Sequence, residues 1–324
     1  MSETPKENNN DTGKPIGAIE GVHEAGEIAP PASVSPGRDA WRRLRKNPVA
    51  VISGLYILLI VLLALGANFI APYDYAFQDT HRYVNLPADP DLHHRLGTDD
   101  LGRDIVSRVI FGARVSLGVT AIVVTVECLV GISFGLIAGF YSGKTDSLLM
   151  RITDVMFAFP DLLLAILIAG IIRAGAEAIS PVVSLGTLFF ALGVTGWPGM
   201  ARLVRGQVLA VREKEYIEAA RAIGVKNGAI MRRHLLPNIS GPIIVQITQD
   251  IAGVILAEST LSFLGLGVQP PYPSWGRMIS DALAFKESRP LLLLVPSLAL
   301  ALTVMAFNFF GDALRDALDP RMRQ

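Results

Sequence analysis

Six long apolar runs leave this chain few folds other than a bundle of membrane-spanning helices. Residues 47–73 contain no charged side chain, and a helix needs about 20 mostly apolar residues to cross the hydrocarbon core. Five further runs lie at residues 115–140, 148–172, 178–200, 239–264 and 290–310. The third run is the most interrupted, since its first half holds Arg151, Asp154, Pro160 and Asp161. We predict an all-α integral membrane protein with six transmembrane helices.

Composition agrees with this class, because 51% of the residues are hydrophobic and only 18% are charged. Residues 1–37 are the exception: they are polar, with few large apolar side chains, and we expect them to be disordered. We expect no cleavable signal peptide at such a start, and we expect the first membrane helix to act as an uncleaved anchor. The formal net charge is zero and gives no reason to expect a nucleic-acid partner.

Lys and Arg placement predicts the orientation of the six spans. If the N-terminus is inside, the inner segments from Arg38 onward hold 18 of these cations and the outer segments hold 9. Cytoplasmic loops of membrane proteins carry the excess of Lys and Arg. We therefore expect both termini, and the loop between the fourth and fifth spans, on the cytoplasmic side.

The outer segment before the second span is long for a simple connection. Apolar residues at helical spacing between Ile105 and Ile110 favour an interfacial helix leading into that span. His93 and His94, with Asp89 and Asp91 nearby, have the chemistry of metal ligands. Solvated loop residues are the commoner explanation, and we predict no metal site.

The inner segment after the fourth span combines helix formers with a precisely placed glycine. Glu218, Ala219 and Ala220 favour a helix, and Gly224 ends or bends it. A second short helix fits between Val225 and Leu236, where Pro237 is expected to break it. The sequence predicts a cytoplasmic helix-turn-helix that carries many cations.

Two features of the second run concern packing and the solute path. Gly131, Gly135 and Gly139 form a doubled GxxxG pattern, which lets another helix approach closely, within the chain or between subunits. Glu127 is an ionisable group at membrane depth, so it either lines a path or sits near the membrane edge and bonds or snorkels outward. The single cysteine, Cys128, cannot form an intrachain disulfide and serves as a small apolar residue.

The motifs of an enzyme or a nucleotide site are missing from the sequence. Gly143-Lys144-Thr145 resembles the end of a P-loop, but Ala138 stands where its first glycine belongs and a membrane helix precedes it. No GxSxG, HExxH or suitably paired carboxylates occur. We predict no catalytic residues and no cofactor, so any ATP that drives this protein is hydrolysed on another polypeptide.

Five sequence blocks together resemble one family of transporters. They are LGTDDLGRDIVSRVIFGAR at 96–114, MRITDVMFAFP at 150–160, EYIEAARAIGVKNGAIMRRHLLPN at 215–238, AESTLSFLGLGVQPPYPSWGRMI at 257–279 and GDALRDALDPRMR at 311–323. The chain is similar to the second permease type of dipeptide, oligopeptide and nickel ABC importers over roughly residues 40–323. His234 departs from the general pattern of the cytoplasmic loop, which has Ile there, and matches its peptide branch.

The resemblance implies a type I permease fold, a second homologous permease, two cytoplasmic ATPases and an external solute-binding protein, in a bacterial or archaeal cell membrane. It makes the cytoplasmic loop, at about 206–238, the element that docks on an ATPase. It also suggests that the segment around Trp275 contacts the binding protein or gates the path, although a rigid turn anchored by this aromatic is an alternative. In the cytoplasmic loop, the resemblance assigns coupling to the ATPase to Glu218, Ala219, Ala220, Gly224, His234 and Pro237.

The same resemblance divides the chain into five regions. They are a cytoplasmic tail at 1–37, a cytoplasmic lead and first span at 38–72, an external segment at 73–114, a permease core at 115–311 and a cytoplasmic tail at 312–324. The solute is expected to be a dipeptide or oligopeptide, with nickel or oligosaccharides as alternatives. From a different class, an ion-coupled transporter would use Glu127 and Asp250 as proton carriers, and a membrane scaffold would need no transport residues at all.

Overall fold

The computed structural model describes residues 36–80, 87–175 and 180–319, and most of this part of the chain is helical. The predicted disordered tail therefore lies, apart from its last two residues, outside the described residues. A single antiparallel bridge joins Thr98 to Asp104. The helices are α1 (Pro36–Lys46), α2 (Pro48–Leu65), α3 (Ala67–Ile70), α4 (Ile105–Tyr141), α5 (Gly143–Phe157), α6 (Asp161–Ala174), α7 (Pro181–Val211), α8 (Glu215–Ala222), α9 (Asn227–Ile230), the π-helical η1 (Met231–Leu235), α10 (Leu236–Phe263), α11 (Trp275–Ala282), the 3-10 turn η2 (Leu283–Phe285) and α12 (Pro290–Leu318).

Among the described residues, five helices are long and apolar enough to cross a membrane: α2, α4, α7, the continuous stretch from α9 to α10, and α12. The predicted third span is a pair, α5 and α6, bent by 79° at a short break. Pro160 lies in that break and disfavours helical backbone at the residue before it. With the bent pair taken as one crossing, the count is six, as predicted.

Several helices run past the ends that hydropathy predicts. The expected interfacial helix is the first part of α4, which begins at Ile105 because the Asp104 side chain accepts a hydrogen bond from the Ser107 amide at 2.7 Å. At the other end of the chain, α12 continues to Leu318, beyond the predicted end at residue 310. Its last turns pack Ala313 and Ala317 against α1, so tertiary packing extends the helix into a charged stretch.

The doubled GxxxG pattern forms the contact between α4 and α7 within one chain. A Cβ atom on Gly135 would lie 2.6 Å from the Cβ of Val204, and one on Gly139 would lie 2.8 Å from the Cβ of Val208. Gly131 approaches Met200 in the same way. Only the missing side chains let the two backbones come this close, so the pattern serves intrachain packing.

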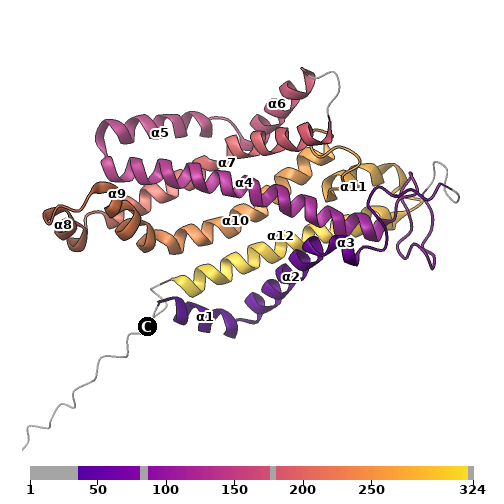
Figure 1. Ribbon diagram of the computed structural model, residues 1–324, viewed down its shortest axis with the longest axis horizontal. Helices are drawn as coiled ribbons and strands as arrows, with labels where there is room; N and C mark the ends of the chain where they lie inside the picture. Colours follow the sequence, from indigo (N-terminus) through magenta and orange to yellow (C-terminus); the bar gives the residue numbers. More distant parts are fainter. Residues whose placement is uncertain (1–35, 81–86, 176–179, 320–324) are drawn as a thin grey trace, which may run out of the picture. The chain divides into compact units, whose positions relative to one another are not determined.

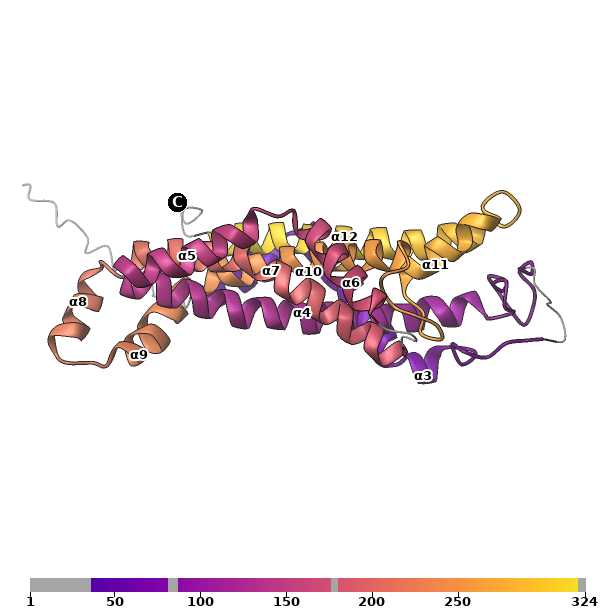
Figure 2. The same cartoon turned by 90° about the horizontal axis from the view of Figure 1, so that it is seen from above.

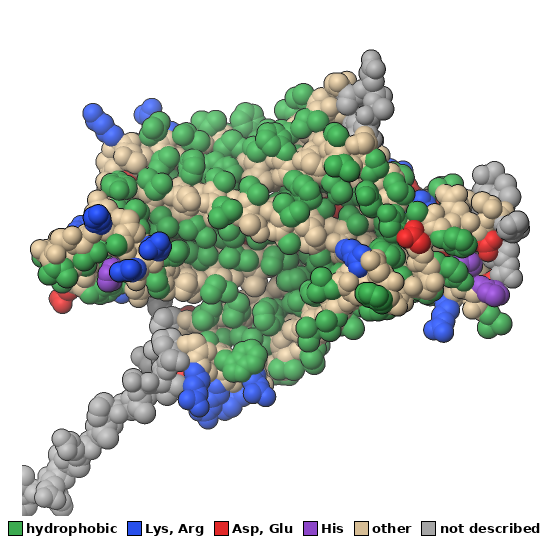
Figure 3. All heavy atoms as spheres, in the orientation of Figure 1, with side chains coloured by type: hydrophobic (Ala, Val, Ile, Leu, Met, Phe, Trp, Pro, Cys, Tyr) green, Lys and Arg blue, Asp and Glu red, His purple; other side chains and the backbone are tan. Residues whose placement is uncertain are grey.

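The two ends of the bundle carry different elements (Figure 1; Figure 2). The α8–α9 segment, α1 and the last turns of α12 lie towards one end, and α3 and α11 lie towards the other. Figure 3 shows a band of apolar side chains between the ends, with Lys and Arg gathered around α8 and α1. The first helix and the end of the last helix thus lie at the same end of the bundle (Figure 1; Figure 2), as they must if both termini are cytoplasmic.

Candidate functional site: the α8 segment, the Glu127 cavity and the outer network

The α8 helix ends in a glycine turn that its sequence dictates. Gly224 has φ +82°, a conformation that side chains with a Cβ rarely adopt. The Gly224 amide donates to the Arg221 carbonyl at 3.0 Å, and the Val225 amide donates to the Ala220 carbonyl at 3.1 Å. These two bonds form a Schellman motif, which satisfies the last carbonyls of the helix and turns the chain sharply.

The two faces of α8 differ in their surroundings. Ile217 and Ala220 are buried in an apolar cluster with side chains from α7, η1 and α10. On the opposite side, Tyr216 is 41% exposed and Ile223 is 80% exposed. Ala219 lies at helical spacing between them and is also exposed. The result is an outward apolar strip, formed by Tyr216, Ala219 and Ile223, at one end of the molecule.

The other predicted residues of this loop have distinct positions. Glu218 and Gly224 are exposed, next to the apolar strip, and Ala220 belongs to the buried face. His234 is half-buried in the π-helical η1 segment, and Pro237 is exposed in the first turn of α10. The structure thus brings Glu218, Ala219, Ala220 and Gly224 together on one helix and its turn, while His234 and Pro237 lie in the chain that returns to the membrane.

The prediction that Pro237 breaks a helix is wrong. The chain runs without interruption from α9 through η1 into α10. In η1 the hydrogen bonds reach one residue further than in an α-helix, as in the bond from the Leu236 amide to the Met231 carbonyl. Such a π-type bulge accommodates the missing amide hydrogen of Pro237 without ending the helix.

Arginines on α7 and just past its end, where the chain leads into α8, bond to α5 and α4. Arg205 forms a two-pronged ion pair with Asp146 of α5, at 2.6 and 2.7 Å. Arg212 donates to the Gly139 carbonyl at the end of α4, at 2.9 Å. Arg205 and Asp146 lie on inner segments that the sequence places on the same side, which is the signal that could have predicted their pairing.

Glu127 is buried in the interior of α4 and is only 4% exposed. Of the alternatives given above, this burial argues against a Glu127 side chain that snorkels outward. Its carboxylate lies directly over Gly196 of α7, where any larger residue would overlap with it. It lines a cavity of about 320 Å³ together with Asp161 and Asp250. Asp250 accepts a hydrogen bond from Gln246 at 2.8 Å.

Trp275 lies in the protein interior, at the first residue of α11. The indole is fully buried, and its Nε1–H donates to the Val109 carbonyl of α4 at 3.1 Å. The ring also fills the space over Gly112. Because its polar atom finds a partner inside the protein, Trp275 anchors the turn before α11, which is the alternative given above, and it does not line the Glu127 cavity.

A fully buried carboxylate on α10, Glu258, escaped the sequence analysis. It accepts hydrogen bonds from Ser262 at 2.7 Å and from Ser116 of α4 at 3.0 Å. Ser262 in turn accepts a bond from the Val268 amide at 3.1 Å, which fixes the turn after α10. The sequence signal was serine at one and four residues after a glutamate in an apolar run.

The outer segment is held by a network of buried ions. Asp99 pairs with Arg103 at 2.6 Å and with Arg108 at 3.3 Å. The His94 ring lies 3.0 Å from the Asp104 carboxylate that caps α4. Among the described residues, no three such side chains are placed to hold a metal ion. His94 therefore has a position typical of a structural residue at the start of α4.

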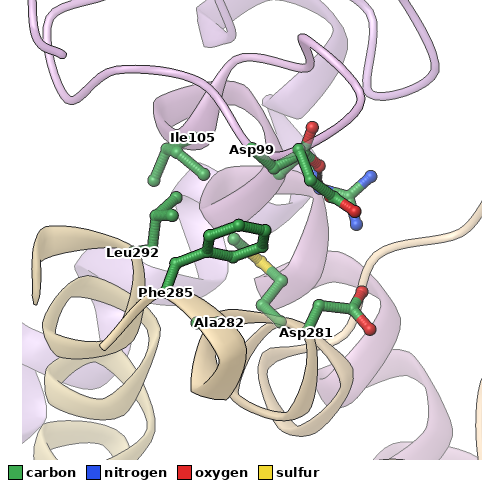
Figure 4. A pocket seen from close by; sticks show the side chains of 9 residues that line it. Asp99, Ile105, Asp281, Ala282, Phe285 and Leu292 are labelled. Atoms are coloured by element: carbon green, nitrogen blue, oxygen red, sulfur yellow. Dashed lines mark ion pairs between the residues drawn. The ribbon is translucent and has the colours of Figure 1, made fainter. Parts of the chain in front are cut away.

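A small cavity of about 20 Å³ separates this network from α11. Figure 4 shows the Phe285 ring between Leu292 and the two carboxylates of Asp99 and Asp281. Burial raises the pKa of the Asp281 carboxyl, and the guanidinium groups of Arg277 and Arg108 oppose that shift. The volume holds about one water molecule, so this cavity is too small for a transported solute.

Comparison with known protein families gives two matches that together cover most of the chain. Residues 131–324 match the binding-protein-dependent transport system inner membrane component, and residues 35–88 match the N-terminal TM domain of oligopeptide transport permease C.

Individual relatives match over nearly their whole length. The dipeptide transport system permease protein DppC of Bacillus subtilis is 43% identical over 303 residues, which cover 93% of this chain and 90% of the relative. The glutathione transport system permease protein GsiD of Pectobacterium atrosepticum is 41% identical over 289 residues, which cover 89% of this chain and 92% of the relative.

Among solved structures, an inward-facing form of the MetNI methionine ABC transporter has a chain similar in fold. The TM-score is 0.53 at 17% identity, and the match covers 65% of this chain and 96% of that one. This similarity supports the type I permease fold.

Proposed function

The chain belongs to the inner membrane components of binding-protein-dependent transport systems, and on that premise we propose that it imports short peptides. It would form the translocation path with a second permease. The observation that carries the transport role is the exposed apolar strip on α8. The peptide as solute is supported by relatives that are dipeptide and glutathione permeases.

The α8 segment is the part of this chain that couples to ATP hydrolysis on a separate subunit. A short helix with the small residue Ala219 between two larger apolar side chains fits a shallow cleft. Ile223 at 80% exposure is costly to leave in water, since burying a side chain of this size contributes about 1.5–3 kcal/mol. Two cytoplasmic ATPases, one for each permease, are the partners that would cover it.

Motion at α8 would reach the solute path through rigid connections. Ile217 and Ala220 pack against α7 and α10, and Arg205 and Arg212 join α7 to α5 and α4. A shift of α8 therefore moves the helices that line the Glu127 cavity, and access changes from one side of the membrane to the other. The cell membrane of a bacterium or archaeon is the proposed location, with an external binding protein delivering the peptide.

The test is reconstitution of the tagged chain, with its co-purifying subunits and binding protein, in liposomes that contain ATP. We expect uptake of dialanine that requires ATP, and loss of the ATPase subunits from the purified complex on Ile223→Asp. Leu283→Asp is the matched control, since Leu283 is an exposed apolar residue at the opposite end of the bundle. Uptake by the chain alone without ATP would contradict the proposal and favour ion coupling through Glu127 and Asp250.

A further inference from the structure

The Glu127 cavity is built from four different helices. Glu127 comes from α4, Asp161 from α6, Thr195 from α7 and Asp250 from α10. The break between α5 and α6 places Asp161 at the first turn of α6. Interrupted helices in membrane proteins line solute sites, because irregular backbone is tolerated there beside a cavity.

Glu127 is the member of this cavity without a partner. Asp250 is bonded to Gln246, and Asp161 lies at a helix N-terminus, where the helix dipole favours negative charge. The Glu127 side chain is 96% buried, and no hydrogen bond or ion pair to it occurs within residues 36–80, 87–175 and 180–319. Its carboxylate lines the cavity without a hydrogen-bond donor from those residues, so a ligand that carries a cation or such a donor would supply the missing partner.

The position of Glu127 also depends on a neighbour with no side chain. The carboxylate occupies the space that a Cβ on Gly196 would fill. Gly196 therefore leaves the room in which the carboxylate can face the cavity. Two independent observations therefore point to the Glu127 carboxylate: Gly196 leaves room for it, and no group among the described residues bonds to it.

The chemistry of the lining indicates the class of ligand. The polar members are three carboxylates, the Thr195 hydroxyl and the Gln249 amide, and the apolar wall includes Leu192 and Val254. No three acidic or histidine side chains in the described part of the chain are placed to hold one metal ion. A volume of about 320 Å³ corresponds to roughly ten water molecules. It lies at the lower end of the range for small organic ligands.

We propose that this cavity binds the free terminal ammonium group of a peptide in transit, with Glu127 as the residue that pairs with it. The apolar wall would accept the first side chain of the peptide, and Asp161 and Asp250 would add to the negative field. This inference rests on the proposed peptide import and adds a specific contact within the membrane.

The first test measures dialanine binding to the purified wild-type complex, without the binding protein, by isothermal titration calorimetry. N-acetyl-dialanine is the comparison, because acetylation removes the ammonium charge and keeps the rest of the ligand. We expect dialanine to bind at least about tenfold more tightly. Equal binding of the two ligands, or no binding of dialanine, would overturn the proposal.

The second test measures dialanine taken up per ATP hydrolysed in liposomes that contain the whole importer. Glu127→Gln keeps the shape and removes the charge, and we expect at least about a tenfold loss. Glu127→Asp restores part of the activity, and Gly196→Ala lowers it by displacing the carboxylate while Glu127 itself is unchanged. Glu287→Gln, the same change at an exposed outer residue, is the control.

Wild-type activity in Glu127→Gln would overturn the ammonium site. A failure of the proposed function is distinguishable, because the wild-type importer would then take up no dialanine while the calorimetry still reports on the cavity.

Discussion

Replacing Gly224 with alanine strains the turn that ends α8 without creating a clash. A Cβ at this position would meet no atom within 4 Å, so sterics with neighbours contribute nothing. The whole cost comes from the backbone at φ +82°, which a residue with a Cβ adopts at about 1–2 kcal/mol. A change of that size lowers the ratio of formed to unformed turn by a factor of roughly 5–30. We expect ATP-driven uptake to fall because α8 loses its fixed direction.

The assay is dialanine uptake together with ATPase co-purification for a short series of variants. Gly224→Asn should retain more activity than Gly224→Ala, since asparagine tolerates the left-handed region. Gly228→Ala is the matched control: this glycine lies in α9, is exposed, and also has open space where a Cβ would be. Its replacement should be neutral or stabilising. Equal effects of the alanine variants at 224 and 228 would refute the argument that the turn conformation matters.

Three further predictions concern the stability of the purified complex, measured as a thermal midpoint. Gly135→Ala should destabilise it by about 1–3 kcal/mol, because the new methyl group overpacks the α4–α7 contact. Gly118→Ala, in the same helix with open space around it, should not, and equal effects would argue against the close approach. Glu258→Leu should cost about 1–3 kcal/mol for each serine hydroxyl that loses its acceptor, with Glu258→Gln milder; a neutral leucine variant would contradict the network. Trp275→Phe should cost about 1 kcal/mol by leaving the Val109 carbonyl without the indole donor, and an unchanged midpoint would deny that bond a role.

Hydropathy predicted the number and type of the spans because the backbone N–H and C=O groups of each run must form hydrogen bonds within a helix inside lipid. It could not predict where the helices end, since tertiary contacts decide this. Asp99 pairs with Arg108 and so stabilises a buried charge in the first turns of α4, and α12 extends past Asp312 because its last turns pack on α1. The prediction that Pro237 ends a helix failed because the π-type bulge before it accommodates the missing amide hydrogen. Sequence composition does not indicate where such a bulge forms.

The candidate site was predicted in part. The order of Glu218, Ala219, Ala220 and Gly224 identified a short helix and its turn, because local propensity and glycine conformation determine both. The surroundings of Glu127 were beyond the sequence, since they depend on Gly196 and Asp250, which come together only when four helices pack. The sequence left two alternatives open for Trp275, because the buried bond from its indole to the Val109 carbonyl depends on how α4 and α11 pack.

The most direct measurement places a photo-crosslinking amino acid at Ala219, in the middle of the exposed strip on α8, and irradiates native membranes. The account predicts an adduct with a subunit that carries the Walker motifs of an ATPase, identified by mass spectrometry. The same probe at Leu283, at the outer end, should give no such adduct. If Ala219 crosslinks only to lipid or to the external binding protein, α8 is not the docking element and the coupling mechanism is wrong.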